Sequence, residues 1–247
     1  MKNLIRAELL KLRTVRVFWA YVAVALAGVP VSIVLVMTGS PGAASLDSSE
    51  GLRNVMSAAS SGALLVLLAG ILLMAGEFRH NTATTTFLIS PDRRGVVAAK
   101  LAAGSVVGIG VACLSFLLTL AIALPWLASR DVEVSIFSRD VGVVLLGSLV
   151  VTALYAVIGV GLGALMSNQT LATTVALVWA FIVESFLVGF APEIGRWLPG
   201  GAASALSETP TAEGGLLPLW GAALLLAGYG LAFAAAGTRL VVRREIT

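Results

Sequence analysis

Residues 141–166 form an apolar stretch that contains no aspartate, glutamate, lysine or arginine. As a helix, such a stretch is long enough to cross the roughly 30 Å hydrocarbon core of a bilayer. Five other stretches resemble it, and in hydrocarbon only a helix or a closed barrel satisfies its own backbone hydrogen bonds. We therefore predict an all-α membrane protein, one transmembrane domain over 1–247 with six transmembrane helices. The expected spans are 17–38, 55–76, 96–127, 141–166, 171–190 and 216–237.

The composition excludes a soluble enzyme. Apolar residues make up 58% of the chain and charged residues only 12%, whereas a soluble domain carries about 25% charged residues. The formal charge of +3 does not indicate nucleic acid binding, because the basic residues stand in short blocks beside apolar stretches. That arrangement is typical of the residues that orient a membrane protein.

The distribution of basic residues predicts that both termini are cytoplasmic. With the N-terminus inside, twelve of the 16 lysine and arginine residues lie on the inner side and four on the outer side. The inner residues are Lys2, Arg6, Lys11, Arg13, Arg16, Arg79, Arg93, Arg94, Lys100, Arg239, Arg243 and Arg244. The outer ones are Arg53, Arg130, Arg139 and Arg196.

The first 16 residues are expected to form an amphipathic helix that lies in the membrane interface. Basic side chains fall on one side of the helical wheel and apolar ones on the other, although Leu9, Leu10 and Lys11 interrupt the pattern. A plain positive anchor for the first span is the alternative. A cleaved signal peptide is disfavoured, because the apolar part of 17–38 is too long for an ordinary signal core. Pro30 is expected to kink this span.

Two connections between spans carry further predictions. Residues 77–95 are polar and face the cytoplasm, and a short helix is expected at 82–90, ended by Pro91. A short helix held between two spans is a docking element. Residues 191–215 form a longer outer loop, which is apolar enough around Trp197 to return toward the bilayer as a re-entrant segment.

The sequence offers no chemistry of its own for nucleotides or metals. There is no GxxxxGK[ST] loop, and the chain has a single cysteine, Cys113, and a single histidine, His80. The pairs Gly104/Gly108 and Gly159/Gly163 are interpreted as sites of close helix packing. The sequon Asn168-Gln169-Thr170 is interpreted as a tight turn between the fourth and fifth spans. No cofactor is expected in this chain.

Glu184 is a carboxylate placed inside a predicted span, where an isolated charge is unfavourable by about 3 kcal/mol. Helical spacing puts Thr174, Leu177, Phe181 and Glu184 on one face. One interpretation is that this face lines a substrate path. The other is that Glu184 lies near the outer surface and reaches water or Arg196.

The connection after the second span resembles the signature region of ABC-2 type transporter permeases. In that family a glutamate closes the second span, a threonine follows, and a Pro-x-Arg element precedes a lysine. The matching residues here are Glu77, Thr82, Pro91-Asp92-Arg93 and Lys100. The interfacial N-terminal helix, the six spans and the short fourth turn are similar too. Phe78, Arg79 and His80 depart from the common family spacing.

The resemblance implies a half-transporter, active as a dimer with two copies of a separate ATPase that holds ATP and magnesium. The dimer would contain two copies of this chain, with a pair of this chain and a related one as the alternative. The helix at 82–90 would be the coupling helix seated in that ATPase. Its docking residues would be Glu77, Arg79, Thr82, Thr86, Pro91, Arg93 and Arg94. The family mostly exports compounds, so we expect export of a hydrophobic or amphiphilic compound across a bacterial plasma membrane.

Two other classes of function remain open from the sequence. A membrane anchor that recruits a soluble partner needs the same docking loop but no transport path. A membrane-embedded enzyme is disfavoured, because the chain shows no recognisable catalytic set.

Overall fold

The computed structural model describes residues 2–38, 48–79, 92–130, 138–166, 168–207 and 215–243. These residues form helices connected by short turns, and six helical stretches among them are long and apolar enough to cross a membrane. The all-α prediction with six spans is confirmed. The helices are α1 (Lys2–Thr14), α2 (Arg16–Thr38), α3 (Ser49–Met56), η1 (Ser57–Ser60), α4 (Ala63–Arg79), α6 (Arg93–Ala128), α7 (Arg139–Met166), α8 (Gln169–Val178), η2 (Trp179–Glu184), α9 (Ser185–Phe190), α10 (Pro192–Gly195), α11 (Pro199–Leu206) and α12 (Leu219–Arg243).

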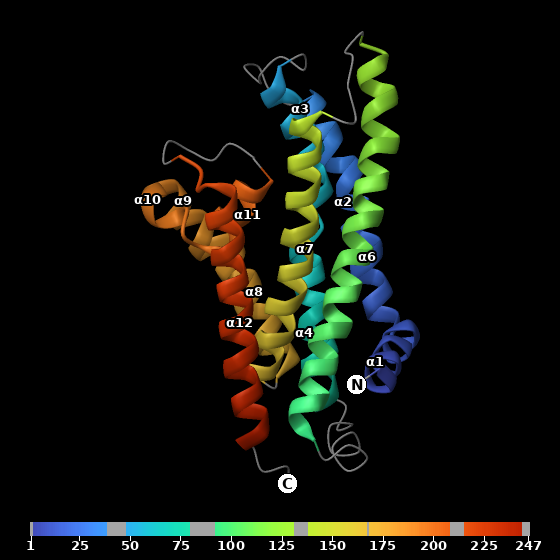
Figure 1. Cartoon of the computed structure of the whole chain (residues 1–247), viewed down its shortest axis with the longest axis vertical. Helices are drawn as coiled ribbons and strands as arrows, with labels where there is room; N and C mark the ends of the chain where they lie inside the picture. The colour runs from blue at the N-terminus through green and yellow to red at the C-terminus, as the bar shows by residue number, and fades with distance from the viewer. Residues whose placement is uncertain are drawn as a thin grey trace.

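The helix α7 lies at the centre of the bundle, beside α4, α6 and α12 (Figure 1). Glycines allow this close packing, as the sequence predicted. A Cβ atom added at Gly163 would lie 2.9 Å from the carbonyl oxygen of Ile71 on α4, and one at Gly159 would overlap the carbonyl of Leu67. On another side of α7, a Cβ at Gly108 would lie 2.9 Å from the Cα of Ala153.

The peripheral helices show the pattern expected of a chain dissolved in lipid. The spans formed by α2 and by α8 to α9 are mostly exposed, and their exposed side chains are large and apolar. In water such surfaces would associate, but in hydrocarbon they require no cover. The span that includes α4 is instead mostly buried in the bundle.

Helix ends follow the sequence with small corrections. Asn168 is the N-cap of α8, where its side chain accepts a hydrogen bond from the backbone N–H of Leu171. The helix α6 continues through Pro125 to Ala128, one residue past the expected end of the third span. Pro125 has no N–H, so the helix loses one backbone hydrogen bond there. The helix α2 likewise runs through Pro30.

The two ends of the bundle differ. The start of α1 and the end of α12 lie at one end, which we call the terminal end, together with the end of α4 and the start of α6 (Figure 1). The helices α3 and η1 lie at the opposite end. The short helix α11 packs beside α12 and α7, α10 packs against α9, and neither extends past the tip of α6 (Figure 1).

Candidate functional site

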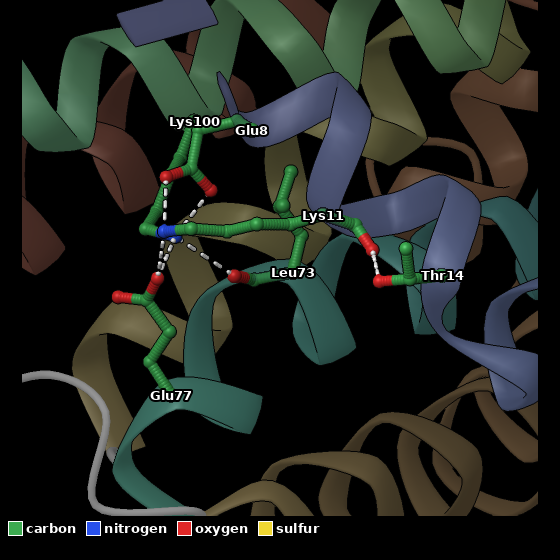
Figure 2. A network of polar contacts seen from close by, with 6 residues as sticks. All are labelled: Glu8, Lys11, Thr14, Leu73, Glu77 and Lys100. Carbon is green, nitrogen blue, oxygen red and sulfur yellow. Dashed lines mark hydrogen bonds and ion pairs between the residues drawn. The ribbon is translucent and has the colours of Figure 1, made fainter. Parts of the chain in front are cut away.

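Four charged side chains meet at the terminal end, where α4 ends and α6 begins. They are Glu8 and Lys11 from α1, Glu77 from α4 and Lys100 from α6, and we call them the charge cluster (Figure 2). The chain between α4 and α6 holds the expected coupling segment, so the cluster lies close to both of its attachment points. Most of that segment, including His80, Thr82, Thr86 and Pro91, lies outside the described residues.

Lys100 is the centre of the charge cluster. Its side chain is fully buried, and its Nζ donates to Glu8 Oε2 at 2.6 Å and forms an ion pair with Glu77 Oε1 at 2.9 Å. The same Nζ donates to the carbonyl oxygen of Leu73 at 3.2 Å. Three acceptors match the three N–H donors of an ammonium group. This arrangement lets a charge persist where water is excluded.

Lys11 closes the cluster from the solvent side. Its Nζ lies 2.8 Å from Glu8 Oε1 and 2.8 Å from Glu77 Oε1, and 47% of its side chain is exposed. Burial opposes the charge, but the hydrogen bonds and charges of Glu77 and Glu8 prevail and raise the pKa of Lys11. Because the pKa of Lys11 is raised, its ion pairs contribute their full stabilisation of the folded state below pH 10.5. This contribution is lost as pH rises through the raised pKa.

The charge cluster ties three helices together. Each glutamate contacts both lysines, so α1 is bonded to α4 and to α6 at one point. Around it pack apolar side chains of α1, α2, α4 and α6, among them Leu12, Phe18, Leu73 and Val97. Because both ends of the coupling segment are attached here, a displacement of that segment acts on a unit of three helices.

Glu8 and Lys11 were not predicted from the sequence to belong to this site. One signal was present, because Glu8 falls on the same helical stripe as Leu4, Ile5 and Leu12, where an apolar residue is expected. A carboxylate on the apolar face of an interfacial helix indicates a buried partner. Glu8 is in fact buried, and Lys100 is the partner.

The arginines predicted to dock a partner have different surroundings. Arg93 is half-buried, and its Nη1 donates to the carbonyl oxygens of Val241 and Val242, both at 3.3 Å, at the end of α12. Arg79 and Arg94 are exposed at the terminal end. Glu77 is buried in the charge cluster, so its contacts within the chain are structural. The exposed arginines are the residues that a partner can reach directly.

A polar depression of about 330 Å³ lies beside the end of α4. Its lining comes from Phe78 and Arg79 on α4 and from Asn168, Gln169 and Thr170 at the start of α8. The Oε1 atom of Gln169 is buried, and no described residue donates a hydrogen bond to it. The depression therefore combines the exposed guanidinium of Arg79 with the exposed side chains of Asn168 and Thr170, which suit polar side chains of another protein.

The four residues predicted to share a substrate path do not share one face. Phe181 is 66% exposed and Thr174 is exposed, whereas Leu177 is half-buried and Glu184 is only 7% exposed. The reason is η2, a π-helical turn that adds a residue to the helical repeat and rotates Glu184 away from Phe181. A role for these residues in a substrate path stays a prediction.

Glu184 neither lines a surface nor pairs with Arg196 in the described contacts. Its carboxylate accepts hydrogen bonds from the backbone N–H groups of Gly200 and Gly201, in the first turn of α11. The first N–H groups of a helix have no partner within the helix. A carboxylate there accepts their hydrogen bonds and also interacts favourably with the helix dipole. Glu184 thus attaches the short helix α11 to the fifth span.

The Glu184→Ala variant is expected to lower the stability of the folded chain. Loss of the carboxylate leaves N–H groups of Gly200 and Gly201 unsatisfied, which costs about 1–3 kcal/mol. Thermal unfolding in lipid nanodiscs measures the change. Glu193→Ala, at an exposed position of α10, serves as the control and should unfold like the unsubstituted chain. Equal melting temperatures for all three proteins would show that Glu184 does not hold α11.

The chain matches a family model described as ABC-2 family transporter protein over residues 4–183. The chain belongs to the ABC-2 transporter family. No curated protein matches it. The matched region includes the whole charge cluster and the coupling segment, and it reaches into η2.

Membership identifies the chain as a transmembrane permease of an ABC transporter, a multi-pass membrane protein and not itself a catalyst. ABC-2 permeases normally pair with an ABC ATPase. In this permease, the residues that the family motif and the N-terminal helix contribute meet in the charge cluster (Figure 2). Among the described residues, no group of three histidine, cysteine, aspartate or glutamate side chains is arranged to hold a metal ion.

Proposed function

We propose that this permease exports a hydrophobic or amphiphilic compound and is driven by a separate cytoplasmic ATPase that docks at the terminal end. ATP and magnesium would be bound in that partner. The terminal end would face the cytoplasm of a bacterial cell, with both chain termini there, as the basic residues favour. The coupling segment after α4 would be seated in the ATPase.

The charge cluster is the observation that carries this proposal. It joins α1, α4 and α6 beside both attachment points of the coupling segment. A force applied to the segment by nucleotide-driven closure of the ATPase would move these helices as one unit. A switch driven by a ligand requires contacts that differ between two states. Contacts between the ATPase and the coupling segment, which the charge cluster attaches firmly to the helices, would supply them.

Exposed residues around the coupling segment supply the docking surface. Arg79 and Arg94 are exposed on α4 and α6, and the depression beside Arg79 carries the exposed side chains of Asn168 and Thr170. An ATPase carrying carboxylates and amide donors fits this surface. Glu77 would act indirectly, because it fixes the end of α4 from within the charge cluster.

A second copy of the permease would complete the transporter. The span formed by α8, η2 and α9 is mostly exposed and carries Phe181, Ile182, Phe186 and Phe190 on its surface. Two of these rings, Phe186 and Phe190, are stacked with centroids 4.4 Å apart. Aromatic surfaces of this kind are frequent in interfaces between protein chains. The substrate would pass between the two copies.

Arg79→Glu should weaken the association of the permease with its ATPase. Reversal of an exposed docking charge removes a charge-assisted contact worth about 1.5–3 kcal/mol, which is roughly tenfold or more in affinity. Co-purification of the two proteins from membranes at fixed salt measures the effect. Arg139→Glu, an exposed arginine at the opposite end of the bundle, is the matched control. The proposal fails if Arg79→Glu retains as much ATPase as the control.

A further inference from the structure

A cavity of about 240 Å³ lies between η1, α7 and α11, at the opposite end of α4 from the charge cluster. Half of its lining residues carry a hydroxyl group: Ser60, Ser61, Tyr155, Ser204 and Ser207. The rest of the lining is small or aliphatic, and no charged side chain contributes to it. None of these residues belongs to the predicted docking surface or substrate path.

The hydrogen bonds among the described residues use only part of the donor and acceptor capacity of these hydroxyl groups. Ser60 donates to the carbonyl oxygen of Ser57 at 2.8 Å, and Ser207 donates to Ser60 at 3.2 Å. Tyr155 is half-buried and its exposed part faces the cavity, yet no described residue forms a hydrogen bond with its hydroxyl. A tyrosine hydroxyl in an apolar setting usually has a partner, which indicates that the cavity supplies one.

The cavity wall is also linked to Glu184. Gly200 lines the cavity, and its backbone N–H is held by the Glu184 carboxylate. A side chain at Gly200 would collide with that carboxylate, because a Cβ there would lie 2.8 Å from Glu184 Oε1. The Glu184 carboxylate is therefore bound to the α11 backbone at Gly200 and is not part of the cavity lining. What remains in the cavity is a set of neutral donors and acceptors.

We propose that this cavity binds the neutral, hydroxyl-bearing head of an amphiphile, such as a single sugar ring, while its apolar tail stays in the surrounding lipid. Its volume of about 240 Å³ suits one ring and not a large head group. Hydroxyl groups both donate and accept, so they match a neutral polyol. A charged head would find no opposite charge in the lining and would lose its hydration. This inference rests on the proposed transport function and names its substrate class.

A labelling experiment tests the proposal. The full-length chain carrying Cys113→Ser and Ser204→Cys is placed in lipid nanodiscs, and its reaction with the small neutral reagent methyl methanethiosulfonate is followed by mass spectrometry. Three amphiphiles with equal tails compete: octyl glucoside, octyltrimethylammonium and octyl sulfate, each below its micelle concentration. Octyl glucoside should slow the labelling more than the two charged amphiphiles do. Ala203→Cys, also in the cavity lining, replaces Ser204→Cys if that variant fails to fold.

Two further variants sharpen the result. Tyr155→Phe removes one hydrogen bond without a change of shape and should weaken the protection by octyl glucoside about fivefold. Ser129→Cys, exposed after α6, should be labelled at the same rate with or without each amphiphile. Absence of labelling in the cavity, equal protection by all three amphiphiles, or unchanged protection in Tyr155→Phe would overturn the proposal. The experiment needs no ATPase, so its failure is distinguishable from a failure of ATPase docking.

Discussion

Lys100→Met is expected to destabilise the permease by about 3–5 kcal/mol, since it leaves the buried carboxylates of Glu8 and Glu77 together with only the half-exposed Lys11 as a cation. The methionine side chain fills almost the same volume as the aliphatic part of lysine. The loss of stability therefore reflects the missing charge and not a change of volume. Thermal unfolding in nanodiscs measures it. A second readout is the nucleotide-dependent cleavage of the coupling segment by a protease, which should lose its dependence on ATP when α4 and α6 are no longer joined.

Two controls define what this result means. Lys11→Met removes a cation that is half exposed, so it should cost far less than Lys100→Met. The double variant Lys100→Met/Glu8→Gln removes a buried charge of each sign and should recover part of the lost stability. An Lys100→Met protein that unfolds like the unsubstituted chain would show that the charge cluster does not hold α1, α4 and α6 together.

Gly159→Val is expected to prevent native packing of α4 against α7. Even a single added carbon at this position overlaps the backbone carbonyl of Leu67, and a backbone cannot rotate away as a side chain can. Overpacking of this kind costs about 3 kcal/mol or more. Because α7 is the central helix, separation of α4 from it also displaces Glu77 from the charge cluster. Gel filtration in detergent should show loss of the monodisperse species, and thermal unfolding should occur at a lower temperature.

Gly142→Ala is the matched control for this prediction. It lies on the same helix, and a Cβ atom there has no neighbour within 4 Å. The substitution adds a better helix former without a clash, so stability should be unchanged or slightly higher. If Gly159→Val behaves like Gly142→Ala, the close approach of α4 and α7 is not what stabilises the bundle.

The positions of the spans were predictable because hydrocarbon imposes a simple rule on sequence. Each of the six spans appears as a helix near its expected bounds, although the second extends back to Ser49 through α3 and η1. The polar residues Glu50, Arg53 and Asn54 hid this extension, because they interrupt the apolar pattern although they lie in the helix α3. Glycine spacing likewise predicted the close contacts of α7.

The site was harder to predict because its members come from distant parts of the chain. The family motif pointed to Glu77 and Lys100, but the order of residues cannot show that both lysines and both glutamates meet across three helices. The helix face on which Glu184 lies was predicted wrongly for a different reason. An ideal helical repeat puts it beside Phe181, and only the π-helical turn, which has no clear sequence signal, rotates it toward α11.

The central claim is that an ATPase engages the connection between α4 and α6. The most direct test places a photoreactive benzoylphenylalanine at position 86, in place of Thr86, and irradiates intact cells. Our account predicts a crosslinked product that contains a protein with a GxxxxGK[ST] loop, in a yield that changes when ATP is depleted, and no such product from position 129. Absence of an ATPase adduct at position 86, with the permease present in the membrane in normal amount, would contradict it.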